Sequence, residues 1–320
     1  MYYADSESLG ITRRKIRSYW AYFQPDGKRI TDRDEIDRLN AIGLPPAYTD
    51  ARYAESANAH LQAIGIDAKG RKQYRYHTDF TAKRNSRKFD NCAGFGRALP
   101  KIRKRVEADL SKRGFTAERA IASILRLLDG GQIRVGNESY AQENGSFGAT
   151  TLRRRHAKVE GNRLALRFKA KSGKLCTLTV SDRGLVRFVK QMQDLPGQRL
   201  FQYKGEDGEF RPITSSEVNA YIHETMGTDY TAKDFRTWAA SVLAFEWLLA
   251  DDGTGSLNEM LLQVSSQLGN TPAIARKSYI HPLLLDIAKS GAKKKLPAQL
   301  PRPARWLTRE ERGLIALLQK

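Results

Sequence analysis

Cysteine is nearly absent from this sequence, which has two such residues among 320. Cys92 and Cys176 lie far apart and form no C-x-x-C pair, so we expect neither a zinc site nor a disulfide framework. Such sparse cysteine usage is typical of proteins that work in a reducing compartment.

Long apolar segments are missing as well. The longest run, SVLAFEWLLA, contains Glu246 and is too short to cross a bilayer. The stretch MYYADSESLGITRRK lacks the apolar core of a secretory signal. The sequence therefore predicts no membrane span and a place of work in the cytosol.

The motifs of nucleotide- and metal-dependent enzymes are also lacking. The sequence has no Walker loop, no G-x-G-x-x-G and no H-E-x-x-H motif, and no acidic cluster suggests two bound magnesium ions. We therefore predict no bound nucleotide and no metal site.

Acidic residues are few relative to basic ones. Thirty-five Asp and Glu against 55 Lys and Arg give a net charge of +20 and a pI of about 10.0. A field of this sign favours polyanions such as DNA, RNA or acidic membrane surfaces. Charge alone does not choose among these partners.

The N-terminal residues 1–85 are predicted to form a small domain rich in β-structure. Residues 31–40 have the pattern of a short helix, which Gly43, Pro45 and Pro46 end. The stretches 47–54, 60–67 and 71–77 alternate or carry β-formers, which indicates a small antiparallel sheet. A linker is expected near residues 82–92.

Residues 90–290 are predicted to form a larger, mainly α-helical domain that contains one β-hairpin. Residues 163–180 alternate on both sides of Ser172-Gly173, which places Lys171 and Lys174 near the tip of that hairpin. Helical periodicity or capping signals mark residues 116–131, 182–193, 215–226, 233–250 and 257–269. We expect a separate basic tail at 291–320, and an α+β fold overall.

A nucleic-acid enzyme without a metal must neutralise phosphate with side chains, and the planar fork of arginine suits that task best. Candidate residues lie next to helix ends, at a helix start or at the hairpin tip. They are Arg134, Lys171, Arg236, Asn270 and Tyr279.

This series resembles the type IB DNA topoisomerases of the small bacterial and poxvirus kind. The matching stretches include DAKGRKQYRYH, IRVGNESYAQENGSFGATTLRRRH, FKAKSGK, TAKDFRTWAASV and LGNTPAIARKSYIHP, in the order of the family. The resemblance covers roughly residues 15–285 and implies a catalytic domain like that of tyrosine recombinases.

The resemblance implies a role for each candidate. Tyr279 would attack a phosphodiester and form a 3′-phosphotyrosyl link, and Lys171 would protonate the leaving 5′-oxygen with help from Arg134. Arg134, Arg236 and Asn270 would donate hydrogen bonds to the nonbridging oxygens. Neither ATP nor an obligatory metal is implied, although divalent cations can stimulate such an enzyme.

Asn270 departs from the viral pattern, which has histidine at this position, whereas bacterial-type members resemble this sequence. Asparagine donates a hydrogen bond but carries no charge and moves no proton. We therefore predict that the position acts as a donor.

The resemblance also implies the contacts to double-stranded DNA. A segment of the N-terminal domain would lie in the major groove, and further cations would meet phosphates. The predicted contacts are Arg71, Lys72, Gln73, Tyr74, Tyr76, Arg153, Arg154, Arg155, Lys174 and Lys233. We expect a monomer that clamps the duplex, without a membrane partner, and a cytoplasmic, nucleoid-associated location.

Two alternatives remain at this stage. A tyrosine recombinase would use similar residues, but its second arginine usually lies in an H-x-x-R motif, whereas this sequence has KDFR with Lys233 first. Residues 305–320 could serve such an enzyme as an exchange helix. A non-enzymatic DNA-binding protein would share the charge but would not need Tyr279.

Overall fold

The structure is a computed structural model that describes residues 1–68, 70–195, 197–227 and 230–319, with only the backbone described at 83–88, 139, 140 and 293. The chain divides into two compact units, Met1–Lys88 and Phe89–Lys320. Each unit has its own hydrophobic core.

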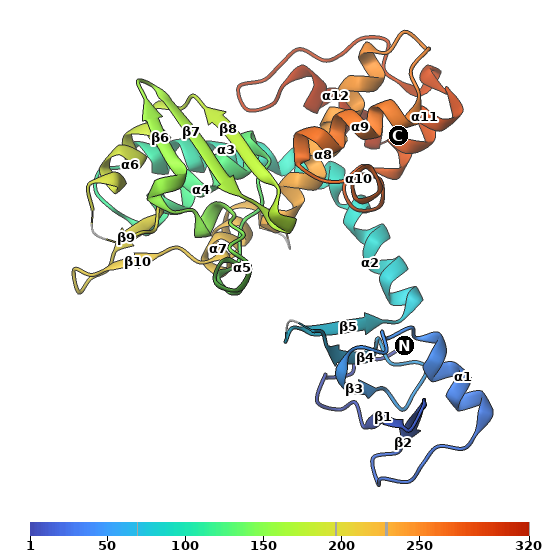
Figure 1. The fold of residues 1–320 in the computed structure, drawn as a ribbon. Helices are drawn as coiled ribbons and strands as arrows, with labels where there is room; N and C mark the ends of the chain where they lie inside the picture. Colours follow the sequence, from blue (N-terminus) through green and yellow to red (C-terminus); the bar gives the residue numbers. More distant parts are fainter. Residues whose placement is uncertain (69, 196, 228–229, 320) are drawn as a thin grey trace. The chain divides into compact units, whose positions relative to one another are not determined.

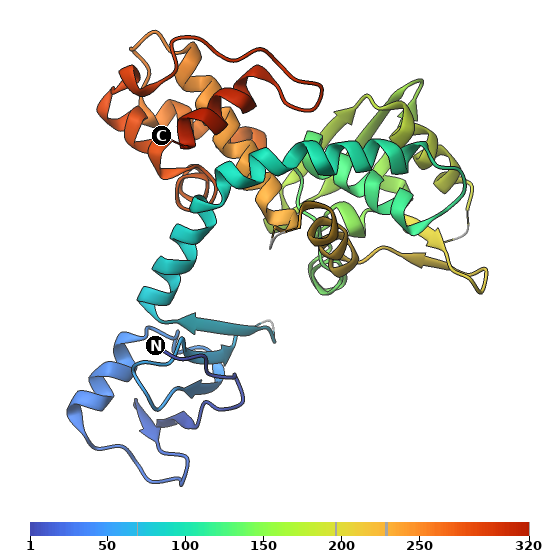
Figure 2. The same ribbon diagram turned by 180° about the vertical axis from the view of Figure 1, so that it is seen from behind.

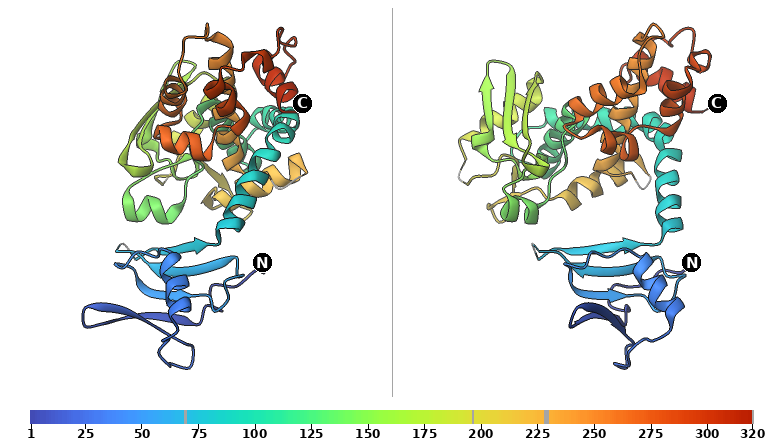
Figure 3. Two further views of the ribbon diagram at one scale, coloured as in Figure 1. Left: turned by 90° about the vertical axis from the view of Figure 1, so that its right-hand side faces the viewer. Right: turned by 45° about the vertical axis from the view of Figure 1, so that its right-hand side comes forward.

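The first unit is an antiparallel sheet with one helix against it. The strands follow the order β2-β1-β3-β4-β5. Helix α1 (Arg33–Ala41) lies against one face (Figure 3), and its Leu39 packs with Tyr22 and Tyr53. The strand bounds are β1 (Ile11–Ile16), β2 (Tyr19–Phe23), β3 (Thr49–Tyr53), β4 (Leu61–Ile66) and β5 (Lys72–Tyr76).

The predicted helix and the three predicted strands of this unit are confirmed. The sequence analysis does not predict β1 and β2, because the stretch ITRRKI puts three cations in a row and hides its alternation. Arg13 is accommodated because its guanidinium donates to the Leu44 and Pro45 carbonyls, each at 2.8 Å.

The expected linker near residues 82–92 contains the boundary between the two units, which falls after Lys88, but it is helical, which the sequence analysis did not predict. Helix α2 (Thr78–Asp90) runs through most of it, and α3 (Cys92–Ser111) begins two residues later. The stretch has neither glycine nor proline before Asp90, so nothing in it breaks a helix.

The second unit is built around helix α4 (Ala117–Gly131), in which Ile124, Leu127 and Leu128 are completely buried. Thr116 caps its start by accepting a hydrogen bond from the Arg119 amide. The helices that contact α4 are α3, α6 (Arg183–Gln193), α7 (Ser215–Met226) and α8 (Ala232–Ala250).

A three-stranded antiparallel sheet packs on α4 and α6, as Figures 1 and 2 show from opposite sides. Its strands are β6 (Ala157–Glu160), β7 (Arg163–Lys169) and β8 (Leu175–Val180). The predicted hairpin is therefore confirmed as β7 and β8, and β6 extends it by one strand. Shorter elements are α5 (Glu138–Asn144), β9 (Gln202–Lys204) and β10 (Phe210–Pro212).

The C-terminal region continues with α9 (Leu257–Leu268), α10 (Pro272–Ser278), α11 (Pro282–Ser290) and α12 (Arg309–Leu318). The expected separate tail at 291–320 is wrong, because α12 packs against α3 and α8 and buries Leu314, Ile315 and Leu317. Thr308 and Glu311 form the capping box that starts α12. The fold belongs to the predicted α+β class.

Replacing Ile124 by alanine should lower the free energy of unfolding of the second unit by about 2–5 kcal/mol, because the side chain is completely buried at the centre of α4. Urea denaturation followed by circular dichroism measures this loss. Leu262→Ala is the matched control, since Leu262 is 59% exposed and should change stability by less than about 0.5 kcal/mol. Equal losses in the two variants would contradict the assigned core.

Candidate active site

Arg236 lies at the centre of the candidate site, in the second turn of α8. It is 4% exposed. Its guanidinium donates to the Leu268 carbonyl at 2.9 Å and to the Gln132 carbonyl. These carbonyls end α9 and α4, where a helix leaves its last acceptors unsatisfied. Arg236 therefore joins three helices at one point.

Arg134 and Asn270 meet across the same site. Gln132 adopts the left-handed conformation (φ 53°) and turns the chain out of α4 toward Arg134. Gly269 does the same at the end of α9 (φ 62°), which allows Asn270 to turn inward. The Arg134 guanidinium donates to Asn270 Oδ1 at 2.5 Å.

Two buried donors in this cluster meet no acceptor among the described residues. They are Asn270 Nδ2 and Arg236 Nε, in side chains that are 7% and 4% exposed. Because a buried donor without an acceptor costs roughly 1–3 kcal/mol, such groups call for an explanation. Both donors suit a ligand that brings acceptor oxygens.

Tyr279 ends helix α10, and its ring is half-buried. The Arg236 guanidinium lies over it, 5.1 Å from the ring centroid. Burial acts to raise the pKa of the Tyr279 phenol, but Arg236, Arg134 and Lys233 together outweigh burial and lower that pKa. The exposed Lys233 thus lies close enough for its charge to lower the pKa of the predicted nucleophile.

The two lysines at the hairpin tip differ in their surroundings. Lys171 is exposed, in a 3₁₀ turn where Ser172 has φ 63°. Lys174 donates from Nζ to the Asn270 carbonyl at 2.9 Å. Lys174 therefore holds the hairpin against the turn between α9 and α10, a role that sequence reasoning missed because the two residues lie 96 positions apart.

A cavity of about 150 Å³ opens between the hairpin, the end of α4 and the end of α9. Arg134, Lys174 and Arg236 line it, together with Cys176, and none of its described lining residues is acidic. A small anion fits such a site, and Arg236, which lines the cavity, also lies over Tyr279, whose phenol has the lowered pKa that a nucleophile needs.

The predicted DNA contacts in the first unit form a row on β5 and the turn before it. Tyr74 and Tyr76 are exposed and stacked, with ring centroids 6.2 Å apart. Arg71 pairs with Asp67 at 2.7 Å, and Gln73 donates to the same carboxylate at 3.0 Å. Lys72 donates to Ser6 Oγ at 3.1 Å.

The three arginines at 153–155 differ in their contacts. Arg154 donates to the Gln193 carbonyl at 2.8 Å and to the Leu195 carbonyl, so its guanidinium is engaged within the protein. Arg153 and Arg155 line an open pocket of about 670 Å³ together with Arg167 and Lys169. Sequence reasoning missed the last two, although β7 marks them as exposed alternate positions.

Among the residues that the structure describes, no group of three or more His, Cys, Asp or Glu could hold a metal ion. In that same part of the chain, no helix is long and apolar enough to cross a membrane.

Comparisons with known proteins give a consistent picture. Residues 72–281 match the family model of the eukaryotic DNA topoisomerase I catalytic core, and residues 19–67 match that of the bacterial DNA topoisomerase IB N-terminal domain. The DNA topoisomerase 1B of Acanthamoeba polyphaga mimivirus is 31% identical over 296 residues, which are 88% of this chain and 88% of that protein.

More distant relatives are also similar. The DNA topoisomerase 1B of vaccinia virus (strain Copenhagen) is 23% identical over 286 residues, covering 84% of this chain and 90% of that protein. A crystal structure of the XerH site-specific recombinase bound to a palindromic difH substrate aligns with a TM-score of 0.37 and 16% identity, over 56% of this chain and 47% of that one.

Arg236→Gln should raise the pKa of Tyr279, because it removes the largest of the charges that stabilise the phenolate. Titration of ¹³C-labelled tyrosine by NMR measures this pKa, and Tyr279→Phe identifies the signal. In the unsubstituted protein the phenol should titrate below its ordinary value of about 10. An unchanged titration in Arg236→Gln would contradict the assigned electrostatics.

Proposed function

This chain belongs to the type IB family of DNA topoisomerases, and from that premise we propose that Tyr279 carries a transient covalent link to DNA while supercoils relax. The Tyr279 oxygen attacks a phosphorus of one strand, a P–O bond to Tyr279 forms, and the P–O5′ bond breaks. The 5′-oxygen leaves and takes up a proton. Attack by that 5′-hydroxyl then reverses the step and reseals the strand.

Charge builds on the nonbridging oxygens of the phosphate during this exchange. The observation that carries the proposal is the set of donors beside Tyr279: Arg236, Arg134 and the buried, unpartnered Nδ2 of Asn270. Donors that are already fixed in place stabilise such charge without reorganisation.

The proton for the leaving oxygen would come from Lys171. Its exposed position at the hairpin tip leaves the ammonium available to DNA, while Lys174 fixes the base of the turn on Asn270. A general acid typically contributes about 10²–10⁴-fold to such a step. Because the phosphotyrosine conserves the energy of the cut bond, resealing needs neither ATP nor an obligatory metal.

Duplex DNA is the partner of this enzyme, and we propose that one copy of the chain clamps it with both units. The stacked Tyr74 and Tyr76 would contact the major groove, and Arg153, Arg155 and Lys233 would contact phosphates. The net charge of +20 suits a location on the nucleoid.

A monomer is supported by the C-terminal helix. A recombinase would pass such a helix to a neighbouring subunit, whereas α12 packs in its own chain and buries Leu314 and Leu317 there. The candidate exchange segment at 305–320 is thus engaged within the second unit.

Relaxation of negatively supercoiled plasmid in EDTA without ATP tests the proposal. The unsubstituted protein should yield relaxed topoisomers, and Tyr279→Phe should yield none, because a phenyl ring has no oxygen for the attack. Tyr203→Phe is the matched control, a half-buried tyrosine of the same unit that should keep activity. Binding without relaxation by all three proteins would favour the non-enzymatic alternative.

The covalent step has its own readout. The reaction is run on a duplex that is labelled at the 5′-end of the cut strand and is stopped with a denaturant. The label should then remain attached to the protein. Label retained from a 3′-labelled cut strand instead would show the opposite polarity of cleavage and refute the 3′-phosphotyrosyl link.

Asn270→Asp should slow single-turnover cleavage by about 10²–10³-fold, because the substitution replaces an amide donor by a carboxylate that only accepts. Asn270→His should keep most of the rate, since imidazole also donates. Equal rates in Asn270→Asp and the unsubstituted protein would show that this position makes no hydrogen bond to the phosphate.

A further inference from the structure

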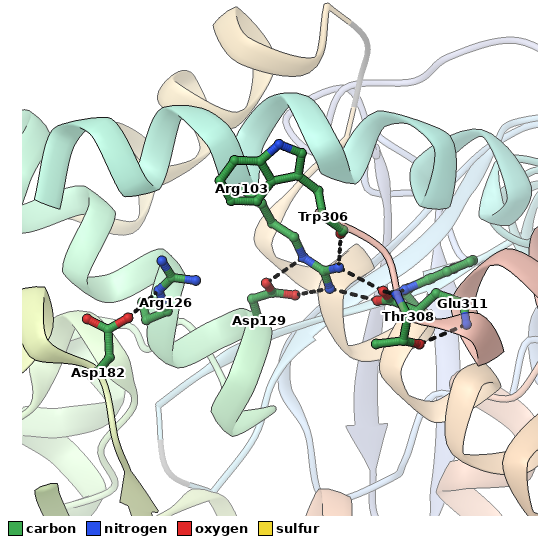
Figure 4. Close-up of polar contacts among 8 residues, drawn as sticks. Arg103, Arg126, Asp129, Asp182, Trp306, Thr308 and Glu311 are labelled. Atoms are coloured by element: carbon green, nitrogen blue, oxygen red, sulfur yellow. Dashed lines mark hydrogen bonds and ion pairs between the residues drawn. The ribbon is translucent and has the colours of Figure 1, made fainter. Parts of the chain in front are cut away.

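A partly buried ionic cluster of Arg103, Asp129 and Glu311 lies where α3, α4, α8 and α12 meet, with side chains that are 18%, 18% and 7% exposed. Arg103 of α3 is its centre, and Figure 4 shows its guanidinium between Asp129 and Glu311. Five hydrogen bonds of 2.6 to 2.9 Å use all of its N–H donors, with the Trp306 carbonyl as the remaining acceptor. The Arg103 guanidinium therefore fixes the orientation of both carboxylates as well as their distance from it.

Each of the two carboxylates that pair with Arg103 is linked to Arg236 through a neighbouring segment. Asp129 lies in the last turn of α4, three residues before Gln132, whose carbonyl accepts from Arg236. Glu311 is 5% exposed and also accepts from Trp238 Nε1 at 3.1 Å. The cluster thus contacts α8, which carries Arg236, and the end of α4, which supplies one of the two carbonyls that accept from Arg236.

Trp238 and Arg236 lie two residues apart on α8, so their side chains point about 200° apart around the helix. Arg236 faces the cavity, and Trp238 faces the cluster. Packing on that rear face is close, because a Cβ at Gly96 would collide with the Trp238 ring and lie 2.9 Å from Ile315 Cγ1. Helices α3, α8 and α12 are therefore in close contact at this point.

We propose that Arg103 and Glu311 are positioning residues for catalysis: through Trp238 and the end of α4 they hold Arg236 against Tyr279, which makes the C-terminal helix part of the catalytic machinery. This inference rests on the proposed function for its activity readout. The titration of Tyr279 tests it independently of cleavage.

The test compares Glu311→Ala with Asp182→Ala. Both residues are acidic, lie at a helix start and pair with an arginine, Asp182 with Arg126 at 3.1 Å (Figure 4). Asp182 starts α6, away from α8 and α12, so its loss should destabilise the unit without moving Arg236. Trp238→Phe is the milder variant, because it removes only the indole donor and keeps an aromatic ring.

Glu311→Ala should raise the pKa of Tyr279, shift the pH dependence of single-turnover cleavage toward alkaline pH, and slow cleavage at neutral pH by about 10- to 100-fold. Trp238→Phe should shift the same quantities in the same direction by less, and Glu311→Gln, which keeps an acceptor for Trp238, should restore part of the rate. DNA affinity should stay unchanged in all three.

Loss of thermal stability alone in Glu311→Ala, as in Asp182→Ala, with an unshifted Tyr279 titration would overturn the inference. If the unsubstituted protein fails to cleave DNA, the proposed function falls, yet a Tyr279 pKa that rises in Glu311→Ala and Trp238→Phe still supports the positioning role.

Discussion

The candidate active site depends on the way in which one buried guanidinium is accommodated. Arg236 is 4% exposed, and a buried charge without partners costs several kcal/mol. The partners are carbonyls at the ends of α4 and α9, where helix geometry leaves acceptors unsatisfied and the helix dipole is negative. Three helices must therefore meet for Arg236 to be stable. The chain that leaves α4 carries Arg134 and the chain that leaves α9 carries Asn270, so satisfying the charge also assembles the site.

The same arrangement leaves positive charge unbalanced. Burial and Arg134 both lower the pKa of Arg236, which means that the two guanidinium groups destabilise each other. No acidic side chain is among the described residues that line the adjoining cavity. A phosphate would relieve this repulsion and supply acceptors for the orphaned donors of Asn270 and Arg236. The folded protein thus carries an energetic cost that a bound phosphate would remove, which favours binding of an anion at this point.

Local signals explain what the sequence could predict. The hairpin was predictable because apolar residues alternate on both sides of Ser172-Gly173, and α7 because Thr214 and Glu217 form a capping box. Arg134, Lys171, Arg236 and Asn270 were candidates because they flank helix ends or the hairpin tip, whereas their roles and the DNA contacts were implied by the resemblance. Contacts between distant positions carry no such signal: nothing near Lys174 points to Asn270, and nothing near Arg103 points to Glu311, 208 residues later. Helix α2 was not predicted, because the expected helical domain begins only at about residue 90.

The Arg103 cluster is better explained by geometry than by stability. A buried ion pair often contributes no more than apolar residues of equal volume would, whereas removing one partner leaves a costly charge. Carboxylates on both sides hold the pKa of Arg103 above its ordinary value despite burial, so the guanidinium stays charged.

What an arginine fork adds over apolar packing is direction, because five donors fix two carboxylates and a carbonyl at once. Direction matters here because Trp238, which donates to Glu311, lies on the opposite face of α8 from Arg236. If α12 served only to complete the hydrophobic core, apolar residues would be enough, and α12 already buries Leu314 and Leu317 there. Glu311 completes the capping box of α12, and its further contacts with Arg103 and Trp238 are the ones that an orienting role requires.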